Sequence, residues 1–263
     1  MLPGGVYRSG ALRLRSGGIR CVLARGNRFS SPDLTYALRL KTNARRGGFV
    51  EDICLCDSVI EQVHGAAAVS VLPPMFLKPA QDELFLHFQT IAGAVPEIPV
   101  LIYNNPGRVG YGLAAAFVSR LAHEIPNIVG MKDTSGDMTL TKERVRLNRD
   151  VGFKVLGGRD TLLYCSLCVG GVGGVCTAGN FMPELIGAVY EKFMAGDLAG
   201  ALEAQFKLNP VRLAMDAASF LVAAKDMAAL RGLDAGLPYL PNLPAPAPVL
   251  EQLRAAMREA GLI

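Results

Sequence analysis

The stretch Asn127-Ile128-Val129-Gly130-Met131-Lys132-Asp133-Thr134 joins a short apolar run to a polar turn. The run is too short and too continuously apolar for a surface helix, so it predicts a strand that is buried on both faces of a parallel sheet. Four more runs of this kind end in polar or Pro/Gly-rich turns: Ala67–Leu72, Pro99–Tyr103, Phe153–Leu156 and Val172–Thr177. The sequence therefore predicts five strands of one parallel sheet.

Segments with apolar residues at helical spacing separate these strands, such as Gln81–Val95 and Leu113–Glu124. Alternating strands and helices predict a parallel sheet with crossover helices. Polar residues follow every strand, which is how a barrel enzyme arranges its site, whereas an open doubly wound sheet gathers them at one switch point. An open nucleotide-binding sheet has only the run Gly170–Gly174 in its favour, and that run lacks the GxGxxG spacing. We therefore predict an α/β fold of the (β/α)8 TIM-barrel type.

The N-terminal segment does not follow this pattern. Its only strand candidates are Val22-Leu23 and Val50–Leu55. At about 250 residues for eight units, three further units would need about 90 residues, more than precede the first clear strand. We therefore expect an atypical or incomplete N-terminal part (1–56), barrel units that carry the active site (57–185) and a C-terminal helical extension (186–263).

The basic charge of the chain is confined to its start. The chain has 27 basic and 23 acidic residues. Residues 1–50 hold ten of the basic residues and one acidic residue, Asp33, so 17 basic and 22 acidic residues remain for positions 51–263. A nucleic-acid groove needs a basic face on a folded element, so we expect no nucleic-acid partner. No run of about 18 uncharged apolar residues is present, so we expect no membrane span. Reduced cysteines are typical of the cytoplasm, where we expect the protein.

The six cysteines include two pairs with metal-like spacing, Cys54 with Cys56 and Cys165 with Cys168. Together these pairs could supply four zinc ligands. Cys165 and Cys168, however, lie in the apolar run Leu162–Val169, where free thiols pack as small hydrophobes. We therefore expect buried, reduced cysteines, no metal and no cofactor.

Three side chains near the strand ends could carry chemistry. Lys132 ends a predicted buried strand, where burial disfavours the charged amine, and a neutral amine is what imine formation with a carbonyl substrate needs. Two other interpretations of Lys132 are a solvent-exposed side chain and an ion pair with Asp133. Tyr103 ends the preceding strand, so its phenol could relay protons beside Lys132, or it could be a half-buried core tyrosine. Arg108 could hold a substrate carboxylate or be an ordinary loop arginine.

Several motifs resemble the signature of one family. Tyr103-Asn104-Asn105-Pro106, then Arg108, then Val129–Thr134 are similar in type and spacing to the dihydrodipicolinate synthase/N-acetylneuraminate lyase family. Further similarities are Pro73-Pro74 with Lys78-Pro79, the Gly157-Gly158-Arg159-Asp160 turn, and a helical tail with Lys225 and Gly232. The resemblance covers about residues 57–263.

This resemblance implies a barrel with a C-terminal helical extension that forms a homo-oligomer, a tetramer or a dimer. It implies that Lys132 forms a Schiff base with pyruvate or a related 2-oxo acid, the small-molecule substrate, and that Tyr103 is the proton shuttle. Arg108 matches the arginine that binds the carboxylate of the second substrate in the synthases. Gly158 and Val175 match positions that line the pocket.

Two departures from the family bear on activity. The family's Gly-Thr-Thr-Gly-Glu-like loop, which binds the carboxylate of the 2-oxo acid, is not found in the sequence, and Phe76 stands where the synthases have a second relay tyrosine. The resemblance implies a class I lyase. Among the reactions of the family, Arg108 favours 4-hydroxy-tetrahydrodipicolinate synthase-like activity. The alternatives are N-acetylneuraminate lyase, 4-hydroxy-2-oxoglutarate aldolase, a sugar-acid dehydratase, and a non-catalytic relative with a damaged barrel.

Overall fold

The computed structural model divides into two compact units, and each is considered by itself. The sheet unit comprises Ala67–Cys176 and Ala188–Phe206. The second unit comprises Met1–Ala66, Thr177–Gly187 and Lys207–Ile263. Up to residue 67 the structure describes only the backbone of short strands, and beyond that point the described residues are 68–75, 78–233 and 235–263.

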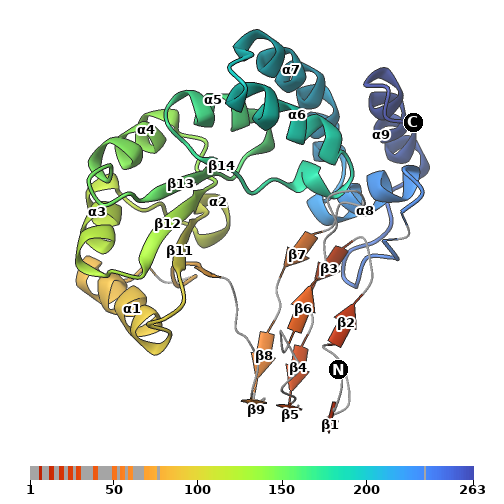
Figure 1. Cartoon of the computed structure of the whole chain (residues 1–263). Helices are drawn as coiled ribbons and strands as arrows, with labels where there is room; N and C mark the ends of the chain where they lie inside the picture. Colours follow the sequence, from red (N-terminus) through yellow and green to blue (C-terminus); the bar gives the residue numbers. More distant parts are fainter. Residues whose placement is uncertain are drawn as a thin grey trace. The chain divides into compact units, whose positions relative to one another are not determined.

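A five-stranded parallel sheet forms the middle of the sheet unit (Figure 1). Its strands are β10 (Val69–Val71), β11 (Val100–Asn104), β12 (Ile128–Asp133), β13 (Lys154–Gly157) and β14 (Gly173–Gly174). The strands lie side by side in sequence order, and each pair is parallel. A doubly wound sheet reverses its order at a switch point, whereas this order runs one way, as in a barrel. The five predicted strands are confirmed, and β14 is the shortest.

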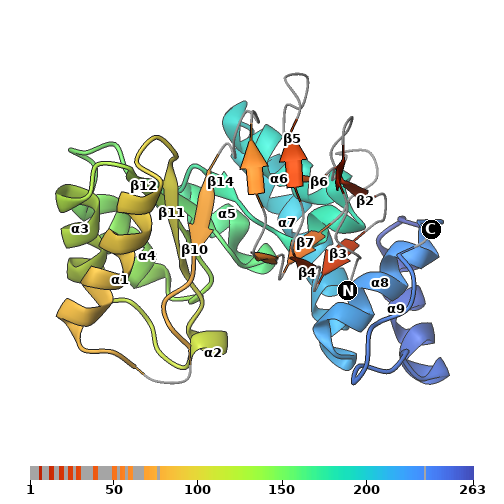
Figure 2. The ribbon, with the colours of Figure 1, turned by 90° about the horizontal axis from the view of Figure 1, so that it is seen from below.

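Helices follow the strands and bury one face of the sheet. They are α1 (Gln81–Ala94), α2 (Pro106–Val109), α3 (Ala115–Glu124), α4 (Met138–Leu147), the 3-10 turn η1 (Asp160–Leu162) and α5 (Leu163–Cys168), with parts of α6 (Pro183–Met194) and α7 (Leu198–Ala214). Helices α1, α3 and α4 lie on one side of the sheet (Figures 1 and 2). The core forms between them and the sheet, where Ile102 and Met131 pack with Phe88, Phe117 and Leu121. The helices expected before and after β11 are confirmed by α1 and α3.

The cysteines of helix α5 correct one prediction. Cys165 and Cys168 are free thiols, but both are exposed, so their predicted burial is wrong. The buried residues of this helix are Leu163, Ser166 and Leu167, which share one face at a spacing of three and four residues. The two cysteines lie off that face, although their segment is apolar in composition.

Helices make up the C-terminal part of the second unit. They are the 3-10 turns η2 (Thr177–Asn180) and η3 (Met215–Ala217), then α8 (Phe220–Leu230) and α9 (Ala247–Glu259), with the remaining turns of α6 and α7. Met182, Leu208 and Leu253 lie fully buried in its core. The predicted helical tail is therefore confirmed. Among the helices that the structure describes, none has the length and apolarity that a membrane crossing needs.

Short strands occupy the N-terminal part of the second unit. They are β1 (Val6–Tyr7), β2 (Leu12–Leu14), β3 (Gly18–Arg20), β4 (Leu23–Arg25), β5 (Arg28–Ser30), β6 (Leu38–Leu40), β7 (Phe49–Glu51), β8 (Cys54–Cys56) and β9 (Val59–Glu61). They pair in parallel with one another, as β1-β5-β9, β2-β6, β3-β7 and β4-β8, and none of these pairings includes β10. The atypical character of the N-terminal part and the boundaries at residues 56 and 185 stay predictions.

Candidate active site

The hydrogen-bond register of the sheet puts Lys132 and Tyr103 side by side. Tyr103 on β11 is the Cα partner of Lys132 on β12, which in turn pairs with Leu156 on β13. Residues in register on parallel neighbours point to the same face, and successive residues alternate between faces. Lys132 and Tyr103 therefore point away from the helices, because Ile102 and Met131, one position earlier, are fully buried on the helix side.

The amine of Lys132 lies over the phenol ring of Tyr103. Its Nζ is 4.1 Å from the ring centroid, and both side chains are half-buried. The Tyr103 hydroxyl accepts a hydrogen bond from Asn105 Nδ2 at 3.0 Å, so its own O–H remains available as a donor. An amine beside a phenol that can give and take protons is what imine formation requires.

The next residue along each strand points toward the helices. Asn104 and Asp133 lie there, and Asn104 Nδ2 donates to Asp133 Oδ1 at 2.9 Å. Asp133 Oδ2 accepts from Thr141 Oγ1 at 2.7 Å and from Arg144 Nη1 at 2.5 Å. The carboxylate is thus bound by groups on the helix side, and the interpretation of Lys132 as its ion-pair partner is wrong.

Asp133 is charged although it is buried. Burial raises the pKa of this carboxyl, but the charge of Arg144 and the hydrogen bonds from Thr141 and two further donors hold the pKa below its ordinary value. The ion pair between Asp133 and Arg144 is closed to solvent, because only 1% of each of the two side chains is exposed. A buried pair of this kind is costly to break, because the remaining charge has no partner.

Arg108 lies just beyond the end of β11. It belongs to α2, a single turn that begins at Pro106 and ends at Gly110 in the left-handed conformation, with a φ of 93°. Its side chain is exposed and makes no hydrogen bond, ion pair or cation–π contact with another residue that the structure describes. An exposed guanidinium at this edge of the sheet can hold a carboxylate through two parallel hydrogen bonds.

Gly158 and Val175 follow the next two strands. Gly158 N donates to Asp133 O at 2.8 Å, and a Cβ at Gly158 would lie 2.2 Å from Thr134 Oγ1, so glycine permits this close approach. Val175 N donates to Gly157 O at 2.8 Å, and 46% of Val175 is exposed. All five predicted site residues therefore lie at the C-terminal edge of the sheet. Their functional roles stay predictions.

Two groups near the Lys132–Tyr103 pair were not singled out in the sequence. The first group is the thiol of Cys176. Burial and the nearby charge of Asp160 raise the pKa of this thiol, while the charge of Lys132 lowers it by a smaller amount. A neutral thiol therefore lies within electrostatic reach of the Lys132 amine. The second group is Arg144, which no short motif links to its partner 11 residues earlier. Phe76, the expected replacement for a relay tyrosine, lies outside the described residues.

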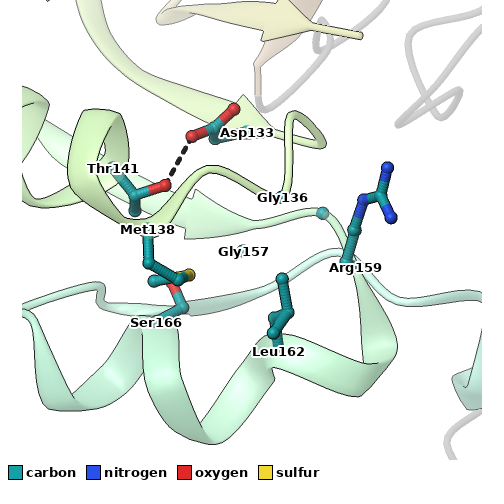
Figure 3. Close-up of a pocket in the computed structure, with 9 residues that line it drawn as sticks. Asp133, Gly136, Met138, Thr141, Gly157, Arg159, Leu162 and Ser166 are labelled. Atoms are coloured by element: carbon teal, nitrogen blue, oxygen red, sulfur yellow. Dashed lines mark hydrogen bonds between the residues drawn. The ribbon is translucent and has the colours of Figure 1, made fainter. Parts of the chain in front are cut away.

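A small cavity lies on the helix side of this edge (Figure 3). The residues that line it come from β12, β13 and the helices and turns beside them: Asp133, Gly136, Met138, Thr141, Gly157, Gly158, Arg159, Leu162 and Ser166. Its volume of about 10 Å³ suits about one water molecule and is too small for a 2-oxo acid. The buried hydroxyl of Ser166 has no hydrogen-bond partner among the described residues.

The fold and the Lys132–Tyr103 pair define a class of protein. Proteins of this class have a parallel α/β fold of the barrel type and carry a lysine and a tyrosine side by side at the ends of adjacent strands. Residues 57–260 match the model of the dihydrodipicolinate synthetase family. The chain belongs to this family. The resemblance expected over residues 57–263 is thereby confirmed, and the fold class with it.

Relatives and solved structures are similar to the same part of the chain. A 4-hydroxy-tetrahydrodipicolinate synthase of Methanopyrus kandleri is 35% identical over 76% of this chain and 66% of its own length, and that of Methanoculleus marisnigri is 36% identical over 75% and 67%. A dihydrodipicolinate synthase from Cyanidioschyzon merolae with lysine bound has a TM-score of 0.71 at 31% identity, covering 75% of this chain and 66% of its own. The one from Thermotoga maritima has a TM-score of 0.72 at 28% identity, covering 75% and 68%. The chain spans about two thirds of the length of the relatives it matches.

The substitution Asp133→Asn should lower the free energy of unfolding at pH 7 by about 3–5 kcal/mol, because it leaves the buried Arg144 without a counter-charge. The pKa of Asp133 is lowered on folding, so its stabilising effect is complete above the unfolded pKa of about 4 and is lost as the pH falls through the folded value. Urea unfolding of both proteins between neutral and acidic pH measures this. The difference in free energy of unfolding between the wild type and Asp133→Asn should be constant near neutral pH and should shrink below about pH 4.

The matched control for this experiment is Glu143→Gln, on the same helix. Glu143 pairs with Arg146 at 2.7 Å in a solvent-accessible position. Its substitution should change stability little at any pH in the series, because exposed pairs are screened. Equal stability of Asp133→Asn and the wild type at neutral pH would contradict the expected cost of leaving the buried charge of Arg144 unpaired.

Proposed function

We propose that the chain is a class I lyase that binds pyruvate or a related 2-oxo acid through a Schiff base on Lys132. The observation that carries this proposal is the position of Lys132 Nζ, 4.1 Å from the centre of the Tyr103 ring at the end of two adjacent strands. Membership of the family supports the same chemistry, since the matched relatives are named as synthases.

In the proposed reaction the neutral amine of Lys132 attacks the keto carbon of the 2-oxo acid and forms a carbinolamine. Tyr103 donates a proton to the departing hydroxyl, so that water leaves and the imine forms. The Tyr103 phenolate left by this step takes a proton from the neighbouring methyl group, which gives an enamine. The enamine carbon attacks the carbonyl carbon of an acceptor, and Tyr103 returns the proton to the oxygen of that carbonyl. Hydrolysis of the resulting imine releases the product and restores the amine of Lys132.

Arg108 is proposed to hold the carboxylate of this acceptor. Its guanidinium is exposed at the edge of the sheet where β11 ends and, within the described part of the chain, is not bound by another side chain. Bidentate binding of a carboxylate is the interaction that a guanidinium makes best. Gly158 and Val175 are proposed to line the pocket from the ends of β13 and β14.

Among the reactions of the family, 4-hydroxy-tetrahydrodipicolinate synthase-like activity is the best supported. The matched curated relatives carry that name, and Arg108 supplies the cation that a carboxylate-bearing acceptor needs. The lyase, aldolase and dehydratase alternatives share the imine on Lys132 and differ only in the later steps of the reaction. A non-catalytic relative with a damaged barrel is the remaining alternative, and it would form no imine on Lys132.

We further propose a cytoplasmic homo-oligomer, a dimer or a tetramer. Tyr190 and Met194 of α6 and Leu198 and Phe206 of α7 are large apolar side chains that stand exposed. Tyr190 and Met194 are four residues apart and therefore share one face of α6, and exposed apolar side chains on a helix face can contact another chain. Sedimentation velocity of the purified protein should therefore give the mass of two or four chains, and a monomer throughout the accessible concentration range would contradict this proposal.

Incubation with pyruvate and borohydride should attach a reduced pyruvyl group to Lys132, because reduction fixes the imine as a stable amine. Intact mass followed by peptide mapping measures it. The adduct should be absent from Lys132→Ala and retained in Lys154→Ala, a control lysine that stands exposed on the neighbouring strand β13. A folded wild-type protein that gives no adduct would sink the proposed reaction and favour the non-catalytic relative.

The substitution Arg108→Ala should lower kcat/KM for an acceptor with a carboxylate by about 10-fold to 100-fold, the value of a lost hydrogen bond to a charged group. Succinate semialdehyde and butanal form a matched pair of probes, since only the first is an anion. Arg108→Ala should lower kcat/KM for succinate semialdehyde and leave kcat/KM for butanal unchanged. Arg149→Ala, at another exposed arginine, should change neither value. Equal losses with both probes would show that Arg108 does not bind the carboxylate.

A further inference from the structure

A closed ring of hydrogen bonds lies behind the Lys132–Tyr103 pair. Arg144 Nη1 donates to Asp133 Oδ2 at 2.5 Å and Nη2 donates to Leu113 O at 2.6 Å. Leu113 N donates to Asn104 Oδ1 at 3.1 Å, and Asn104 Nδ2 donates to Asp133 Oδ1 at 2.9 Å, which closes the ring. Each of the four residues is therefore bound to two others.

The ring is closed to solvent. Asn104 is 0% exposed, Arg144 1%, Leu113 2% and Asp133 5%. Hydrogen bonds in such surroundings are electrostatically stronger than in water, and a polar group left without its partner there is correspondingly costly. The geometry of the ring is therefore tightly determined.

Two members of the ring are the immediate neighbours of the proposed catalytic residues. Asn104 follows Tyr103 on β11, and Asp133 follows Lys132 on β12. The backbone turns each side chain to the opposite face from its neighbour, so fixing Asn104 and Asp133 on the helix side also fixes the direction of the two catalytic side chains. The third member, Leu113, holds the segment that follows the turn with Arg108.

We propose that Arg144 is a positioning residue for the reaction at Lys132, acting through Asp133, Asn104 and Leu113. It comes from helix α4 and closes the ring from behind the sheet, without touching the substrate. Buried ion pairs contribute little net stability compared with a well-packed apolar core, so stability alone does not account for a pair at this place. The inference rests on the proposed function, because it concerns the residues that carry the imine.

The test compares Arg144→Met with Arg146→Met, an arginine that pairs with Glu143 at a solvent-accessible position on the same helix. The rate of borohydride-trapped adduct formation on Lys132 is measured over a series of pyruvate concentrations. Arg144→Met should reduce the maximal rate by about 10-fold to 100-fold, the loss that a displacement of about 1 Å can cause, with the half-saturating pyruvate concentration largely unchanged. Arg146→Met should match the wild type.

An unchanged maximal rate in folded Arg144→Met would overturn the proposal, and so would a loss that appears only as weaker pyruvate binding. Should this variant fail to fold because Asp133 is left unpaired, the double variant Asp133→Asn, Arg144→Met removes both charges and decides instead. It keeps an acceptor for Asn104 but breaks the link to Leu113. A slow maximal rate in the folded double variant supports the proposal, and a wild-type rate overturns it.

Failure of the proposed function is recognised separately, because the wild type would then form no adduct. The position of Lys132 is in that case followed by its reductive methylation with formaldehyde and cyanoborohydride, which needs no substrate site. The methylation of Lys132 relative to that of Lys154 is measured within each sample, once for the wild type and once for Arg144→Met. A changed ratio supports the positioning by Arg144, and an equal ratio refutes it.

Discussion

The candidate site depends on one constraint, the alternation of side chains along two adjacent parallel strands, β11 and β12. At the end of each strand one residue points to either face: Tyr103 and Lys132 away from the helices, Asn104 and Asp133 toward them. A shift of register by one residue would exchange the two pairs, placing the amine in the core and removing the carboxylate from Arg144. The buried apolar residues of the same strands oppose that shift, because they would leave the core together.

The sequence predicts the elements whose buried face is apolar and misses those whose buried face is polar. The strands and helices α1 and α3 bury apolar side chains at the spacing of their own secondary structure, which is visible without tertiary information. Helix α4 buries Thr141 and Arg144 instead, three residues apart, and the residue that caps its C-terminal end, Asn148, is buried too. Patterns of apolar residues give no sign of such a helix, since its polar face is satisfied by Asp133 and Leu113 from other elements.

The same division runs through the site. Lys132 and Tyr103 could be identified because polar residues at the ends of apolar runs stand out, and their spacing resembles a family motif. Arg144 could not, because the choice of the arginine that meets Asp133 depends on where α4 docks against the sheet. The exposure of Cys165 and Cys168 could not be read from an apolar composition either, since it depends on which face of α5 is covered.

The ring of hydrogen bonds that the structure describes behind the Lys132–Tyr103 pair lies within the residues that match the family, in β11, β12, α4 and the segment at Leu113. Binding of the 2-oxo acid carboxylate is a separate matter, because the family loop that provides it is not found in the sequence. A chain with a correctly placed amine and a weakly held carboxylate would show a poor apparent affinity with a normal maximal rate. That signature is the opposite of the one expected from a misplaced pair, so the kinetics of adduct formation separate a defect of the N-terminal part from a defect of the ring behind the site.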